Sequence, residues 1–283
     1  MSTTVLSQRP IGEQLRDWRM RRHLSQLDLA NLAEISPRHL SFIETGRSIP
    51  SRALLLRLSD RLDIPLRERN RLFTAAGYAP MYAERSLDDE ALATARRAVE
   101  LVLRGHEPYP ALAIDRHWRM QAANRALAPF LKGVAPTLLE PPINVLRLSL
   151  HPEGVAPRIA NLGQWRSHLL ARLRKQVENT DDAVLAALLE ELTAYPAPAH
   201  NEEVDAAAIV VPMRFRSEAG ELEFLSTTTV FGTPQEVTLS ELAIESFFPA
   251  NAKTAQVLRT LSLVGRALRP FPFLGGNRRV PGT

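Results

Sequence analysis

The sequence has no cysteine and only three lysines among its 283 residues. Without cysteine the chain cannot form a disulfide bond, and it offers no thiolate to a structural zinc ion. No apolar run is long enough to cross a membrane. The first fifteen residues also lack the basic start and apolar stretch of a secretory signal. We therefore expect a cytoplasmic protein that has no membrane partner.

The sequence also lacks the motifs of common catalytic sites. It contains no Gly-x-Ser-x-Gly, no Walker A motif and no Gly-x-Gly-x-x-Gly, and its seven histidines show no metal-binding spacing. A self-cleaving repressor would need a Ser–Lys pair, but Lys132, Lys175 and Lys253 fall in or beside predicted helices. We therefore expect no catalytic residue, no metal and no cofactor.

The charges are unevenly distributed. Residues 1–80 hold thirteen Arg, no Lys and eight acidic residues, a net charge of +5, whereas residues 81–283 hold twenty-two basic and twenty-three acidic residues, a net charge of −1. A small basic segment ahead of a neutral one indicates an anionic partner for the first segment. The same pattern could reflect only the preference for Arg over Lys throughout the chain, which is 32 to 3.

The first eighty residues are predicted to form five short helices. Ser25 and Ser36 are suitable N-caps, Pro37 suits a first helical turn, and Gly46 ends the helix that follows Ser36. Ser51 caps the next helix. The helices at 26–33 and 37–45 are separated by a turn of three to four residues, which is the spacing of a DNA-binding helix-turn-helix.

The second of these helices has two different faces. Leu40 and Ile43 fall on one face and can anchor the helix in the bundle. Arg38, His39 and Phe42 fall outside that face, which suits entry into a major groove, where Arg can bind guanine and an apolar group can touch a thymine methyl. An ordinary helical hairpin with a solvated face remains the alternative.

The stretch LSQLDLANLAEISPRHLSFIETGRSIPS resembles the lambda-repressor-like domain of the xenobiotic-response-element (XRE) family, over about residues 9–77. The resemblance rests on Ser25, Gln26, Leu29, Ala30, Ser36, Glu44, Gly46, Arg47, Pro50 and Ser51. It implies double-stranded DNA as the partner and a structural pair between Arg19 and Glu44. Glu34 departs from the family pattern, which has Gly or another small residue in the turn.

The resemblance also implies a role for each DNA-facing position. Gln26 and the start of its helix would touch phosphate, Arg38, His39 and Phe42 would face bases, and Ser41, Thr45, Arg47 and Ser51 would lie near the backbone. With the cap and first turn of the recognition helix, the predicted DNA-binding set is Gln26, Ser36, Pro37, Arg38, His39, Ser41, Phe42, Thr45, Arg47 and Ser51. A single short recognition helix predicts a homodimer on a two-fold symmetric site.

The rest of the chain mixes strands and helices. A helix at 86–104 is expected to lead into short strands at 110–115 and 118–124. Two long helices at 157–178 and 181–194 precede a hairpin of strands 207–217 and 221–231. The segment 237–249 is ambiguous between strand and helix and is taken as mostly strand, and a helix follows at 252–268. The predicted fold is therefore multidomain, with an all-α head of five helices followed by an α+β domain with an antiparallel sheet.

Two stretches of this second region show a family resemblance. AIDRHWRMQAANRALAPFL resembles the opening of a PAS fold, and NVLRLSLHPEGVAPRIANLGQWRSHLLARLRKQV resembles the ligand-binding domain of MmyB-like transcription regulators. We accordingly divide the chain into a DNA-binding domain at 9–80, a linker helix at 81–106, a PAS-like domain at 107–268 and a flexible tail at 269–283. The resemblance implies a small apolar effector, such as a fatty acid.

Alternating apolar residues of the hairpin indicate where such a ligand could bind. One strand presents Val211, Met213 and Phe215. Across the hairpin, Phe224, Val230 and Phe231 could complete an apolar wall, and Trp165 and Leu169 of the helix at 157–178 could cover it as a lid. The candidates for a charged headgroup are Arg147, His151, His168 and Arg214. Any one of the apolar residues could instead be packed core, and each polar candidate could equally be a surface residue. The whole domain could instead serve only oligomerisation in a constitutive DNA-binding protein.

Overall fold

The computed structural model describes residues 9–180, 182–196 and 211–264. The chain divides into two compact units. We call them the head (Met1–Arg85 with Thr233–Ser240) and the body (Ser86–Gly232 with Glu241–Thr283). Each unit is described by itself.

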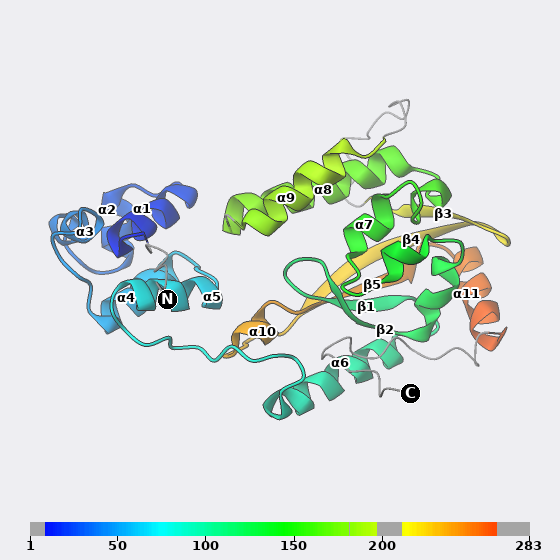
Figure 1. The fold of residues 1–283 in the computed structure, drawn as a ribbon, viewed down its shortest axis with the longest axis horizontal. Coiled ribbons are helices and arrows are strands. Elements are labelled where there is room, and N and C mark those ends of the chain that lie inside the picture. The colour runs from blue at the N-terminus through cyan, green and yellow to red at the C-terminus, as the bar shows by residue number, and fades with distance from the viewer. Residues whose placement is uncertain (1–8, 181, 197–210, 265–283) are drawn as a thin grey trace, which may run out of the picture. The chain divides into compact units, whose positions relative to one another are not determined.

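Five helices make up the N-terminal part of the head, as the sequence predicts (Figure 1). They are α1 (Ile11–Arg21), α2 (Gln26–Leu32), α3 (Pro37–Glu44), α4 (Arg52–Arg61) and α5 (Leu66–Ala75). Ser25, Ser36 and Ser51 each accept a hydrogen bond from a backbone N–H of the helix that follows, so all three predicted caps form. Ser25 also completes a capping box with Asp28.

The head encloses its own apolar core. Leu15, Leu40, Leu55 and Phe73 come from four different helices, and none of them is exposed. Gly12 brings α1 against the end of α3, because a Cβ atom at this position would lie 2.3 Å from the Ile43 carbonyl oxygen. Helix α3 is therefore fixed to α1 by close backbone approach as well as by side-chain packing.

The head includes one segment from much later in the chain. Helix α10 (Val237–Ser240) belongs to it, and the Val237 N–H donates to the Ala83 carbonyl oxygen over 2.9 Å. Glu236 is buried and accepts from the Arg85 and Leu239 N–H groups, both over 2.8 Å. The strand predicted over 237–249 is therefore wrong for residues 237–242, because Glu236 caps the helical turn of α10 and β5 begins only at Ala243.

The body is built on a five-stranded antiparallel sheet. Its strands are β1 (Ala111–Ile114), β2 (Met120–Ala123), β3 (Met213–Ser217), β4 (Gly220–Val230) and β5 (Ala243–Pro249). Their order is β2-β1-β5-β4-β3, so the last strand of the chain lies in the middle of the sheet. Register pairs Thr228 with Glu245 and Ser226 with Phe247 between β4 and β5. This confirms the α+β architecture.

Helices cover the sheet (Figure 1). The body's helices are α6 (Ala93–Gly105), α7 (Val145–Leu150), α8 (Leu162–Thr180), α9 (Ala183–Ala194) and α11 (Ala252–Val264). The 3-10 turns are η1 (Glu90–Leu92), η2 (Arg125–Leu131), η3 (Pro136–Leu139) and η4 (Ala156–Arg158). None of the helices in the described ranges is long and apolar enough to cross a membrane.

Several predicted boundaries shift. The helix expected at 86–104 begins as an α-helix only at Ala93, because the Asp89 carboxylate accepts from the Ala91 N–H and caps a 3-10 turn first. The segment 124–131, whose residues NRALAPFL suggest a helix, forms the 3-10 turn η2 (Arg125–Leu131), which contains Pro129. The tail at 269–283, the end of the last helix and residues 207–210 lie outside the described residues.

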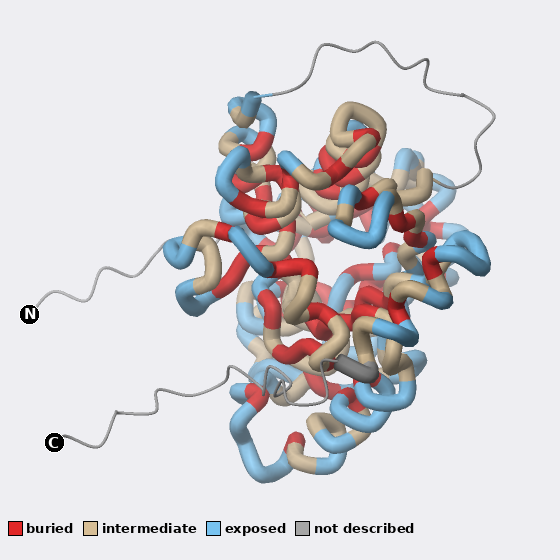
Figure 2. Tube along the Cα trace, turned by 90° about the vertical axis from the view of Figure 1, so that its right-hand side faces the viewer, coloured by how far each residue is buried: buried red, intermediate tan, exposed pale blue. Residues whose placement is uncertain are grey.

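The body's main core lies between the sheet and α7, α8 and α9. It contains Leu112 of β1, Leu146 of α7, Leu173 of α8 and Leu188 of α9, all buried. Figure 2 shows how buried positions alternate with exposed ones along the chain, as amphipathic elements require. The ligand cavity described below lies within this core.

Candidate DNA-binding surface and ligand cavity

The recognition helix α3 presents polar and aromatic side chains to solvent. Arg38 and His39 in its first turn are exposed, whereas Leu40 and Ile43 are fully buried in the head. Ser41 and Phe42 are half-buried. The sequence therefore predicted correctly which face of α3 is anchored and which is free.

Two arginines flank the Phe42 ring. The Arg38 guanidinium carbon lies 5.4 Å from the ring centroid and that of Arg47 lies 5.8 Å from it. Both distances are in the range of cation–π contacts, in which the quadrupole of an aromatic ring attracts a guanidinium group. Because Arg38 and Arg47 remain exposed, they place two positive charges close to one aromatic group at the head surface.

Other predicted DNA contacts occupy the edges of this surface. Pro37, Thr45 and the caps Ser36 and Ser51 are exposed. Gln26 differs, because its side-chain N–H donates to Glu44 Oε2 over 2.8 Å. Its amide is therefore held by the head's interior, while the N-terminus of α2 remains at the surface.

The predicted pair between Arg19 and Glu44 forms, and it is buried. Arg19 Nε donates to Glu44 Oε1 over 2.7 Å and Nη2 donates to Oε2 over 2.9 Å, while Nη1 donates to the Leu24 carbonyl oxygen. The side chains are 10% and 2% exposed. The hydrogen bonds that Arg19 donates to Glu44 raise the pKa of Arg19. This bidentate pair ties α1 to the C-terminal end of α3.

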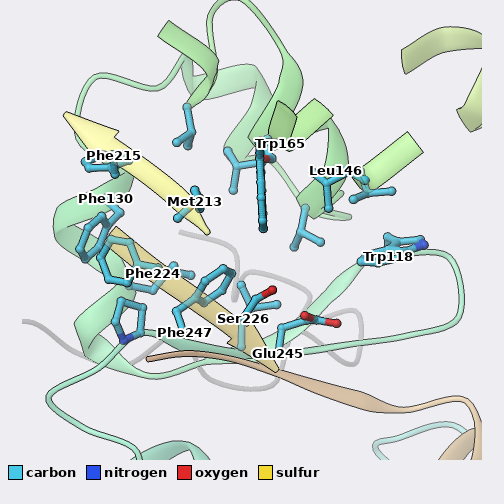
Figure 3. A pocket seen from close by; sticks show the side chains of 18 of the residues that line it. Trp118, Phe130, Leu146, Trp165, Met213, Phe215, Phe224, Ser226, Glu245 and Phe247 are labelled. Carbon is cyan, nitrogen blue, oxygen red and sulfur yellow. The ribbon is translucent and has the colours of Figure 1, made fainter. Parts of the chain in front are cut away.

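The body contains an apolar cavity of about 110 Å³ between the sheet and α7 and α8 (Figure 3). Its wall is largely aliphatic and aromatic. The lining residues are Pro110, Leu112, Trp118, Leu127, Phe130, Leu131, Val145, Leu146, Leu148, Ser149, Val155, Trp165, Leu169, Arg172, Met213, Phe215, Phe224, Ser226, Glu245 and Phe247.

The cavity has one polar corner, formed by Arg172, Ser226 and Glu245. Arg172 Nη2 donates to Glu245 Oε1 over 2.6 Å, and the Arg172 guanidinium carbon lies 4.6 Å from the Trp118 ring centroid. The Glu245 residue is only 5% exposed. Figure 3 shows Ser226 and Glu245 side by side on the sheet side of the pocket, with Trp165 above them.

Five of the predicted ligand-binding residues line this cavity. They are Trp165, Leu169, Met213, Phe215 and Phe224. Met213 and Phe224 are directly paired in the hairpin register, and Phe215 is two residues along the same face of β3. Trp165 and Leu169 are one turn apart on α8, facing the sheet.

The four polar candidates lie outside the cavity lining. Arg147 donates to both carboxylate oxygens of Glu191, which raises the pKa of Arg147. The His151 ring packs edge-on against Tyr195. Arg214 lies on the face of β3 opposite Met213 and Phe215, where its Nε donates to Glu221.

His168 stacks on Trp165, with ring centroids 5.6 Å apart, but it does not reach the cavity wall. Burial lowers the pKa of His168, and the charge of Arg172 lowers it further. The ring is therefore mostly neutral at neutral pH and does not supply a positive charge for an anionic headgroup.

Three further hairpin residues do not contribute to the wall. Val211 packs half-buried against the body core outside the lining. Val230 is 61% exposed, and Phe231, which follows the end of β4, is half-buried outside the lining. Strand β4 runs past the cavity, so the wall predicted from Val230 and Phe231 is wrong for these two residues.

The polar corner is what sequence reasoning missed. Arg172 is seven residues after Trp165 and three after Leu169, so helical spacing alone places it on the face assigned to the lid. Glu245 lies two residues before Phe247, on the same face of β5, but the sequence of this segment was ambiguous between strand and helix. No local pattern links Arg172 to Glu245, because they are brought together only by the tertiary fold.

Comparison with known protein families gives two matches. Residues 10–72 match the family described as helix-turn-helix domain. Residues 95–261, more than half of the chain, match the family described as MmyB-like transcription regulator ligand binding domain. Comparison with curated proteins finds no match.

The fold, the exposed recognition helix and the cavity thus define a DNA-binding transcription regulator that carries a ligand-binding domain. The chain belongs to the MmyB-like transcription regulators, through its ligand-binding domain. The matched families are regulator families and not enzyme families. Among the described residues, no group of three or more acidic or histidine side chains is placed to hold a metal ion.

Proposed function

We propose that this regulator binds a small apolar effector in the body cavity, and that binding changes the affinity of the head for its operator DNA. The observation that carries the proposal is the cavity itself, because a packed core usually has few voids larger than a water molecule. About 110 Å³ enclosed by side chains such as Leu127, Phe130 and Phe224 suits an apolar group.

Fatty acids and related acyl compounds are the first class of effector to test. An engineered apolar cavity of about 150 Å³ binds benzene, so the cavity as it stands accepts a compact group or part of a chain. A longer chain requires the wall to open. Met213 suits that role, because it is half-buried in the wall and its unbranched side chain repacks easily.

The head would read DNA in the manner of XRE-family domains, with α3 in the major groove. Support comes from the exposure of Arg38 and His39 and from the two arginines held against Phe42. Recognition of two half-sites about 34 Å apart would require a homodimer. The exposed apolar residues Leu101 and Val102 on α6, 58% and 46% exposed, favour a dimer contact at that helix.

The chain offers a covalent path from the cavity to the head. Ser226 and Glu245 lie on β4 and β5, and the connection between these strands carries α10, which belongs to the head. A shift of the two strands by a ligand would act on the Glu236 cap and the hydrogen bonds at Ala83 and Arg85. The coupling needed is modest, typically about 1–3 kcal/mol.

The alternative is a constitutive DNA-binding protein whose body serves only oligomerisation. That interpretation predicts no cavity, so the cavity favours the effector interpretation.

Mass spectrometry of small molecules released from the purified protein tests the proposal first. An apolar compound in stoichiometric amount supports it. A protein that releases nothing, and whose DNA binding is unaffected by any apolar compound, would leave the oligomerisation interpretation in place.

A further inference from the structure

One carboxylate oxygen in the cavity wall lacks a partner. Both hydrogen bonds that Glu245 accepts through its side chain end on Oε1, one from Arg172 over 2.6 Å and one from Thr228 over 2.9 Å. Among the described residues, none donates to Oε2. Oε2 is not among the fully buried polar atoms without a partner, so this oxygen remains accessible to a further hydrogen-bond donor.

The surroundings of Glu245 do not supply that partner. The residue is 5% exposed and lines the cavity together with Ser226, which lies on β4 two residues before Thr228, the register partner of Glu245. The two cavity-lining indoles are already engaged elsewhere, since Trp118 donates to Gln176 and Trp165 donates to Ser149. Because Glu245 lines the cavity, a ligand in that space could donate to this remaining oxygen.

We infer that the polar corner selects an apolar molecule with a neutral hydrogen-bond donor, such as a hydroxyl or an amide N–H, in preference to a carboxylate anion. This inference rests on the proposed function and specifies its ligand. The donor of the ligand would bond to Glu245 Oε2, while its oxygen could accept from the Ser226 hydroxyl. Its apolar body would lie among Phe224, Phe247 and Trp165.

An anionic headgroup suits the corner poorly. The charge of Arg172 is already neutralised by Glu245 at hydrogen-bonding distance, so the corner as a whole carries no net charge. A second carboxylate beside Glu245 would place two like charges together in a region largely shielded from solvent. Such an anion also has no hydrogen to donate to Oε2.

Four probes with the same ten-carbon skeleton separate charge from donor capacity. They are 1-decanol and decanamide (donors), methyl decanoate (a neutral acceptor) and decanoate (an anion). Binding to the full chain can be followed by tryptophan fluorescence, because Trp118 and Trp165 line the cavity. We expect the two donors to bind most tightly and decanoate at least about tenfold more weakly than decanol, as the loss of a hydrogen bond to a charged group implies.

Glu245→Gln tests the assigned residue directly. The substitution removes the negative charge of Glu245 and leaves the positive charge of Arg172 unpaired. Decanoate should therefore bind more tightly, decanol should bind about tenfold more weakly, and the preference for decanol over decanoate should reverse. Glu191→Gln is the matched control. It also neutralises the acid of an Arg–Glu pair, with Arg147, but outside the cavity, and it should leave the wild-type ranking unchanged.

The results have distinct meanings. If the wild type binds decanoate more tightly than decanol, this inference is overturned and the proposed function stands. The same holds if a folded Glu245→Gln variant binds the four probes in the same order as the wild type. If Glu245→Gln does not fold, the wild-type ranking alone decides. If none of the four probes changes the fluorescence, this inference fails. The proposed function fails with it only where the purified protein also releases no apolar compound and no apolar compound affects its DNA binding.

Discussion

Replacing Glu44 by Ala should destabilise the head more than almost any other change to a charged residue. The substitution removes both carboxylate oxygens that Arg19 contacts, together with the acceptor of the Gln26 amide. Arg19, whose side chain is 10% exposed, would keep only its bond to the Leu24 carbonyl. Breaking a buried pair on one side costs about 3–5 kcal/mol.

That cost is large relative to the stability of the unit. A unit of about 90 residues is typically stable by about 5–13 kcal/mol. Relief of the unfavourable position of Glu44 at the C-terminal end of α3 returns only about 0.3–1 kcal/mol. For a domain of this size, the remaining loss lowers the melting temperature by at least about 10 °C.

Hydrogen exchange read by mass spectrometry can measure this effect in the full chain, because peptides of the head and the body are resolved separately. Asp17→Ala is the matched control. Its pair with Arg9 has a similar length of 2.6 Å, but the two side chains are 35% and 57% exposed, so it should cost no more than about 1 kcal/mol. Equal destabilisation by the two variants would refute the burial argument. A Glu44→Ala head of unchanged stability with altered base preference would mean that Glu44 faces DNA.

Four further predictions concern single positions. Arg38→Ala should cost about 1–3 kcal/mol of operator binding free energy and relax the preference at one base pair, whereas Arg47→Ala should lower the affinity for all DNA sequences alike. Competition binding against a DNA library distinguishes the two results, and unchanged binding by the Arg38 variant would show that α3 is not the recognition helix. Gly12→Ala should destabilise the head by about 1–3 kcal/mol in denaturant unfolding, because the new Cβ would overlap the Ile43 carbonyl oxygen. An unchanged unfolding free energy would mean that α1 can move away from α3 without cost. Glu34→Gly should stabilise the head by up to about 1 kcal/mol in the same assay, because Glu34 has φ 55°, a left-handed conformation that is strained for residues with a side chain but not for Gly. A loss of stability would contradict this. Met213→Trp should fill the cavity and abolish ligand uptake while basal DNA binding persists; unfolding of the body would show instead that the position is packed core.

The head could be predicted in detail because its signals are local. Ser25, Ser36 and Ser51 each cap a helix within three residues of their own position, so sequence spacing is enough to find them. Glu34 is also explained by the structure. It adopts the left-handed conformation that favours glycine, which is the residue type that the family resemblance led us to expect in the turn.

The body was less predictable because its site depends on distant contacts. The apolar wall could be anticipated at Met213, Phe215 and Phe224, where strand alternation is clear. The polar corner could not, since Arg172 and Glu245 are 73 positions apart in the sequence and join only when α8 packs on the sheet. Conversely, Arg147 looked suitable for a headgroup by residue type alone, and its pairing with Glu191 depends equally on the fold.

The most direct test of effector-controlled DNA binding is a titration of operator DNA followed by fluorescence anisotropy, with and without a saturating ligand that has been identified by its effect on tryptophan fluorescence. Effector control predicts a change in operator affinity of about 5–150-fold, together with an equal change in ligand affinity when operator is present. Loss of ligand binding in Met213→Trp would establish that the ligand occupies the cavity. If such a ligand leaves the operator affinity unchanged, effector control of DNA binding is contradicted.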